Sequence, residues 1–128
     1  MTPAAVVLDS SVWIEILGSG PLSKICEKER VGASLVIVPT LVFYEVYRKI
    51  CSMLSEDQAL AAVAAMAQHE VLDLTQDVAL TAADLSLQHD LGMADSLILA
   101  HAKLKGATLV TLDNDFSGIP GVKIPRKK

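Results

Sequence analysis

The sequence predicts a three-layer α/β/α sandwich with a mostly parallel central sheet. Short apolar runs rich in valine alternate along the chain with longer segments that carry helix-capping signals, which is typical of alternating strands and helices. The strongest of these runs are mostly apolar, as expected of strands that helices cover on both faces. With 128 residues, 52% hydrophobic and 20% charged, the chain is expected to form one domain over 1–128 around a single core.

The first part of the chain predicts two successive strand and helix pairs. The apolar run that ends before Asp9 indicates a buried strand, and a second one ends at Pro39. Gly18–Pro21 interrupts the helical region between them. The expected elements are a strand over 4–8, helices over 12–17 and 22–29, and a strand over 34–38.

The rest of the chain continues the alternation, with recognisable helix ends. Thr40, Ser55 and Thr75 are placed to cap helices, and Gly106 is placed to end one. The expected helices cover 40–54, 56–69, 76–89 and 94–105. The expected strands cover 71–74, 108–112 and, at the edge of the sheet, 122–124.

Charge and hydropathy exclude several classes of protein. The net charge of −4 and the pI of about 5.2 make the protein as a whole repel polyanions, so chemistry on a phosphate requires a bound cation. The longest apolar run, 59–67, is too short to cross a membrane, and the amino terminus does not resemble a secretion signal. We therefore expect no membrane association and a cytoplasmic location.

Four acidic residues stand where a parallel sheet places its functional groups. Asp9 and Asp113 each follow a predicted strand, although Asp is also a common capping and turn residue. Asp95 lies on the apolar stripe of its helix, so it either caps the helix amino terminus or meets a cation. Glu45 lies in a mostly apolar helical stretch, where a surface pair with Lys49 is the simpler explanation.

Together, the four acids indicate a metal site. Carboxylates that converge at one sheet edge repel one another, and a divalent cation relieves that repulsion. Oxygen ligands favour Mg²⁺ or Mn²⁺, and such a centre polarises a phosphoryl oxygen and activates water. The set therefore favours a metal-dependent phosphoesterase.

Four segments of the chain resemble the PIN-domain ribonucleases, especially the VapC-type toxins of toxin–antitoxin pairs. The segments are Val6–Ser11, Pro39–Glu45, Met93–Ile98 and Thr108–Phe116. The resemblance implies a PIN-like fold, an endoribonuclease with Mg²⁺ or Mn²⁺ as cofactor, an RNA substrate, an antitoxin partner and a homodimer. It also implies site residues: Asp9, Glu45, Asp95 and Asp113 as catalytic and metal-binding acids, Asp115 as a candidate outer ligand, and Ser11 and Thr111 as supporting hydroxyls.

Two other functions compete with this interpretation. A receiver-type signalling domain has a similar length, but it carries paired acids after its first strand and a Lys before Pro. Here Asp9 is followed by Ser10, and Lys123 by Ile124. A catalytically silent PIN-fold interaction module is the second alternative, and the presence of all four acids argues against it.

Overall fold

The computed structural model describes residues 4–127, and a five-stranded parallel sheet forms its centre. The strands are β1 (Ala5–Leu8), β2 (Leu35–Pro39), β3 (Glu70–Leu72), β4 (Thr108–Val110) and β5 (Val122–Lys123). Their order across the sheet is β3-β2-β1-β4-β5, and every neighbouring pair is parallel. The predicted α/β fold with a mostly parallel sheet is confirmed.

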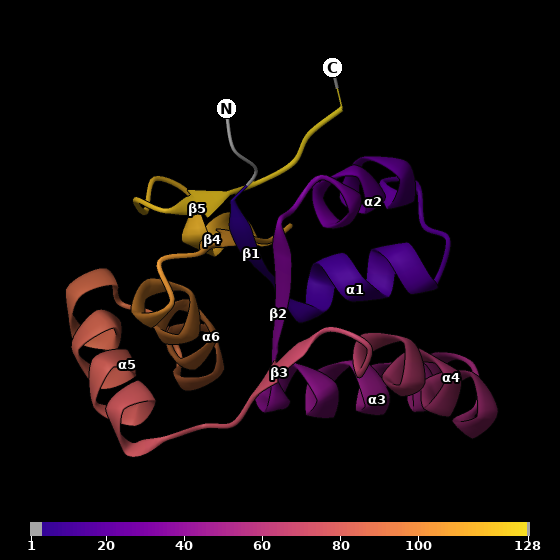
Figure 1. Cartoon of the computed structure of the whole chain (residues 1–128), viewed down its shortest axis with the longest axis horizontal. Helices are drawn as coiled ribbons and strands as arrows, with labels where there is room; N and C mark the ends of the chain where they lie inside the picture. Colours follow the sequence, from indigo (N-terminus) through magenta and orange to yellow (C-terminus); the bar gives the residue numbers. More distant parts are fainter. Residues whose placement is uncertain (1–3, 128) are drawn as a thin grey trace.

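Helices cover the sheet on both sides, which completes the three-layer arrangement (Figure 1). The helices are α1 (Ser10–Leu17), α2 (Ser23–Val31), α3 (Thr40–Met53), α4 (Glu56–Met66), α5 (Gln76–His89) and α6 (Met93–Leu104). The pair α1 and α2 lies on one side of β1, and the pair α5 and α6 lies on the other (Figure 1). Helix α3 follows β2 and packs against α4 and α1.

The core consists of the apolar strands and the inner faces of these helices. Val7, Leu8 and Leu109 are fully buried in the central strands, and the largest buried side chains are Trp13 and Phe116. Burial of a large apolar side chain contributes about 1.5–3 kcal/mol, so the strands are held mainly by the helices that cover them. Among residues 4–127 no helix is long and apolar enough to cross a membrane.

All six predicted helices are present, and their ends lie within three residues of the predicted ones; the largest difference is in α4, which ends at Met66 instead of 69. Ser55 and Thr75 cap their helices through hydrogen bonds from the backbone N–H groups of Gln58 and Val78. Helix α1 begins at Ser10 instead of 12 because the Asp9 side chain is its amino-terminal cap.

Thr40 was predicted as a cap and is instead the first residue of α3. The capping position is Pro39, which has extended backbone and no side-chain acceptor to offer. Strand β4 ends at Val110, two residues earlier than predicted, because Thr111 and Leu112 turn into the acidic site described next.

Candidate active site

Asp9 lies at the carboxyl end of β1 and is almost completely buried, with 5% of its surface exposed. One carboxylate oxygen accepts hydrogen bonds from the Ser11 hydroxyl and from the Val12 backbone N–H at 3.3 Å. The other accepts one from the Thr111 hydroxyl. Burial raises the pKa of Asp9, and the two hydroxyl donors oppose that rise.

The two hydroxyl groups connect Asp9 to the segment after β4. Thr111 Oγ1 accepts a hydrogen bond from the Asp113 backbone N–H at 3.0 Å, and Ser11 Oγ accepts one from the Leu112 N–H at 3.0 Å. Each hydroxyl therefore donates to Asp9 while it accepts from the chain that carries Asp113. This network fixes the position of the fourth acid relative to the first.

Removal of the Thr111 hydroxyl is expected to lower stability. Thr111→Val keeps the shape of a fully buried side chain but leaves an Asp9 oxygen without a donor and the Asp113 N–H without an acceptor. The free energy of unfolding, measured by urea denaturation, should fall by about 2 kcal/mol. Thr111→Ser retains the hydroxyl and serves as the control. An unchanged urea midpoint for Thr111→Val would show that the network carries little energy.

Asp95, Asp113 and Asp115 form the closest group of acids in the described chain. Each of the three offers a carboxylate oxygen, and these oxygens all lie within 4.8 Å of one another. Asp113 also accepts a hydrogen bond from the Asp115 N–H at 2.9 Å, which caps the 3₁₀ turn Asn114–Phe116. Burial raises the pKa of Asp95, and the charges of Asp113, Asp9 and Asp115 raise it further.

Of the two explanations offered for Asp95, capping finds no support. The cap of α6 is Gly92, and it has no side-chain capping bond. Ile98 and Leu99, which follow Asp95 on the same stripe, are buried as predicted. Asp95 thus lies at the inner edge of its helix and faces other acids, an arrangement that suits a cation.

Glu45 lies on α3 near the group but outside it. Its Oε1 atom is buried and has no hydrogen-bond partner among the described residues. Burial raises its pKa, the nearby Ser10 hydroxyl opposes the rise, and the charges of Asp9 and Asp95 add to it. The predicted surface pair with Lys49 is absent: the two ion pairs found in residues 4–127 join Arg30 to Glu27 and Lys123 to Glu29.

These acids fit a divalent cation. Between residues 4 and 127, neither ion pair supplies a basic group to them, so their mutual repulsion is not neutralised by the chain itself. The closely spaced oxygens of Asp95, Asp113 and Asp115 and the unpartnered Oε1 of Glu45 are hard oxygen donors of the kind Mg²⁺ and Mn²⁺ prefer. The sequence interpretation missed Ser10, whose hydroxyl acts on the Glu45 carboxylate. A serine beside a helix cap carries no distinctive signal in the sequence.

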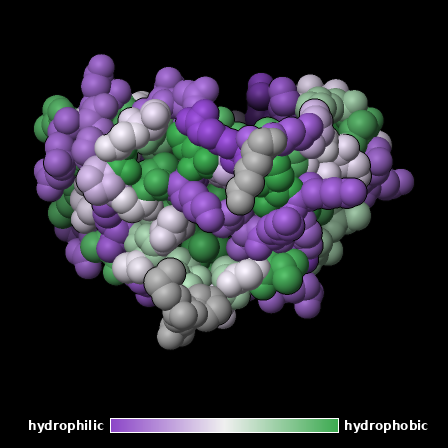
Figure 2. All heavy atoms as spheres, turned by 90° about the horizontal axis from the view of Figure 1, so that it is seen from above, coloured by the Kyte–Doolittle hydropathy of each residue, from purple (hydrophilic) through white to green (hydrophobic). Residues whose placement is uncertain are grey.

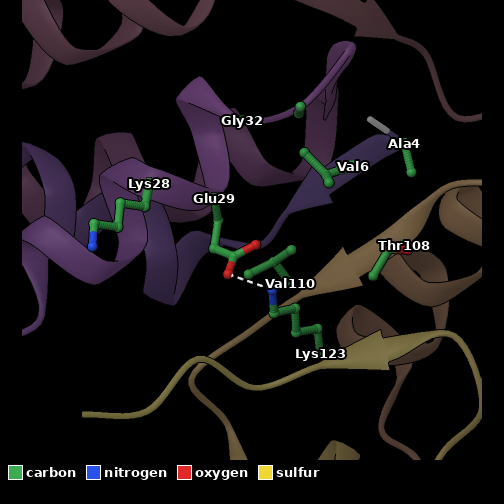
Figure 3. A pocket seen from close by; sticks show the side chains of 9 residues that line it. Ala4, Val6, Lys28, Glu29, Gly32, Thr108, Val110 and Lys123 are labelled. Carbon is green, nitrogen blue, oxygen red and sulfur yellow. Dashed lines mark ion pairs between the residues drawn. The ribbon is translucent and has the colours of Figure 1, made fainter. Parts of the chain in front are cut away.

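A separate cavity of about 370 Å³ lies on the sheet face beside α2, and no acid of the site lines it (Figure 3). Val6 and Val110 form its floor, and Glu29 and Lys123 are bridged at 2.7 Å across it. It contains none of the predicted site residues.

The fold and the acidic site define a class of protein that comparison with known families confirms. The family model of the PIN domain matches residues 6–122, and the chain therefore belongs to the PIN domain family. No curated protein matches it by sequence. The sheet order also differs from the 2-1-3-4-5 order of receiver domains, which argues against that alternative.

Among solved structures, the chain is similar to proteins of toxin–antitoxin systems. A toxin–antitoxin complex from Klebsiella pneumoniae matches with 24% identity and a TM-score of 0.80, over 96% of this chain and 99% of that one. A sarcin-ricin loop cleaving VapC toxin from Mycobacterium tuberculosis matches with 20% identity and a TM-score of 0.78, over 94% and 99%. A VapBC-family protein from the same organism matches with 26% identity and a TM-score of 0.70, over 98% and 100%.

Proposed function

We propose that the protein is a metal-dependent endoribonuclease, the toxin of a toxin–antitoxin pair, which acts on RNA in the cytoplasm. The observation that carries this proposal is the group of carboxylates from Asp95, Asp113 and Asp115, which no basic residue of 4–127 neutralises, next to the buried Asp9 of a PIN domain. A bare acidic site repels RNA, whereas the same site with divalent cations attracts a phosphate.

In this proposal the acids have different tasks. Asp95, Asp113 and Glu45 hold Mg²⁺ or Mn²⁺, with Asp115 as an outer ligand. Asp9 also binds the metal, and through the hydroxyl groups of Ser11 and Thr111 it holds the segment that carries Asp113 in place. The cation, when bound, polarises the phosphodiester and lowers the pKa of a water molecule, so no covalent nucleophile is needed.

The partner we propose is an antitoxin protein that neutralises the acidic site. Several of the similar solved structures are toxin–antitoxin complexes, which supports the existence of such a partner. An antitoxin segment with Arg or Lys would satisfy the unneutralised carboxylates in place of the metal.

We also propose a homodimer, which the resemblance implies and exposed apolar side chains support. Trp13 is 2% exposed and packs inside the domain, so it offers no contact surface, whereas Tyr44 is 64% exposed. The exposed apolar residues include Leu80 and Leu87 of α5, at 60% and 88%. On the face drawn in Figure 2, hydrophobic side chains stand in separate groups between hydrophilic ones.

Sedimentation velocity is expected to give a dimer at micromolar concentration, because association covers exposed apolar side chains. Leu87→Glu should shift the protein toward the monomer if α5 is the contact, and Leu60→Glu, on α4, is the matched control. A monomer for the unaltered protein at high micromolar concentration would contradict the homodimer.

The nuclease proposal is tested by incubation with labelled fragments of ribosomal and transfer RNA in the presence of Mg²⁺. We expect cleavage of at least one RNA by the unaltered protein and at least about a 100-fold slower rate for Asp113→Asn. Asp84→Asn, which changes an exposed acid of α5, is the matched control. Intact RNA under all conditions would favour the catalytically silent PIN-fold module instead.

A further inference from the structure

A cavity next to Glu45 contains the basic residues that the acidic site itself lacks. Its volume is about 360 Å³, and it is lined by Ser10, Ile14, Tyr44, Glu45, Arg48 and Lys49. Because Glu45 and Ser10 also belong to the acidic site, the cavity continues that site along α3.

The exposed side of α3 presents an aromatic ring and two cations together. Tyr44 and Arg48 are four residues apart and therefore share one face of the helix, with Lys49 beside them. Tyr44 is 64% exposed, although burial of an aromatic ring is strongly favourable. Neither Arg48 nor Lys49 has a carboxylate partner within 4.0 Å among residues 4–127, even though Glu45 lies one helical turn from Lys49.

We propose that this cavity binds the nucleotide adjacent to the cleaved phosphodiester of a single-stranded RNA segment, with its base stacked on Tyr44 and its phosphate held by Arg48 and Lys49. This inference rests on the proposed nuclease function and adds to it the surface that positions the strand. Aromatic stacking combined with cations is the usual way to hold a single strand without dependence on its sequence. An acidic peptide fits less well, because its carboxylates would approach Glu45 with no stacking to offset the repulsion.

The net charge of the protein makes such a local basic surface necessary. At −4, the chain as a whole repels RNA, and metal at the acids attracts only the phosphate that it contacts. Two unpaired cations one turn from Glu45 provide attraction for the next phosphate along the strand.

The test measures binding of a fluorescein-labelled single-stranded RNA of ten mixed nucleotides by anisotropy, with Ca²⁺ in place of Mg²⁺. Tyr44→Leu should weaken binding about 10-fold, because stacking of one base contributes about 1–3 kcal/mol. Tyr44→Phe keeps the ring and should bind normally. Arg48→Gln and Lys49→Gln should each make the slope of log K against log salt less steep by about 0.7, the value for one phosphate contact on a single strand.

Lys105→Gln, which removes an exposed cation at the end of α6, is the matched control and should change nothing. Melting temperatures establish that each variant is folded. Unchanged RNA affinity of Tyr44→Leu and Arg48→Gln would overturn the inference. Binding of polyglutamate, an acidic peptide, is measured in the same way, and the inference would also be overturned if the variants lost binding to polyglutamate but kept binding to RNA. Failure of the unaltered protein to cleave any RNA would contradict the nuclease proposal, and with it the position of the bound nucleotide beside a cleaved bond. Anisotropy would still decide separately whether the cavity binds single-stranded RNA.

Discussion

Cleavage of RNA is expected to stop when EDTA removes divalent cations and to return when Mg²⁺ or Mn²⁺ is added. Burial raises the pKa of Glu45, and the charges of Asp9 and Asp95 raise it further. Burial and the charges of Asp113 and Asp9 raise the pKa of Asp95 in the same way. Without metal, the carboxylates of this site repel a phosphate, and the site has no group that activates water. The assay is cleavage of labelled RNA with and without chelator.

The same experiment has a second readout that does not depend on activity. A ligand that binds only the folded state stabilises it by about 2.7 kcal/mol at 100 times its dissociation constant, so Mg²⁺ should raise the melting temperature. The shift should be smaller in Asp113→Asn and unchanged in Asp84→Asn. Undiminished cleavage in EDTA, with removal of the metal verified by elemental analysis, would refute the metal requirement.

The fold was predictable because its main determinants are local in the sequence. The strand that ends at Leu8 is apolar without interruption and the strand from Thr108 is mostly apolar, which already indicates helices on both faces. The capping residues Ser55 and Thr75 act through bonds to N–H groups three residues away, so their effect is visible in sequence. The role of Asp9 was harder to predict. Its side chain caps α1, so the helix begins two residues earlier than predicted.

The site was predictable in composition but not in arrangement. The sequence proposed Asp115 only as an outer ligand, and it did not show that an oxygen of Asp115 lies within 4.8 Å of oxygens of both Asp95 and Asp113. Which acids approach most closely depends on how α6 packs against β4 and on the turn that follows β4, and sequence spacing does not give these. The role of Thr111 as a donor to Asp9 spans 102 residues and follows from pairing of β1 with β4.

Asp95→Asn is expected to raise the stability of the metal-free protein while it lowers cleavage at least about 100-fold. Burial and the charges of Asp113, Asp9 and Asp115 raise the pKa of Asp95 in the folded state. A raised folded pKa contributes stability that is fully present below the unfolded value of about 3.9 and is lost as pH rises through the folded value. At neutral pH the ionised Asp95 therefore destabilises the metal-free fold, and Asn removes that charge with little change of shape.

Thermal unfolding in EDTA, measured from pH 4 to pH 8, tests this expectation. The melting temperature of the unaltered protein should fall relative to that of Asp95→Asn as pH rises, by about 4 °C for each 1 kcal/mol of repulsion that the substitution removes. Addition of Mg²⁺ should narrow or reverse the difference, because the metal stabilises the unaltered site more. If Asp95→Asn instead lowered stability in EDTA and left cleavage intact, Asp95 would stabilise the amino terminus of α6 and would not bind the metal. A rise in stability together with a loss of activity is the signature of a carboxylate that destabilises the fold without its cation, because substitution of a purely structural residue would not raise stability.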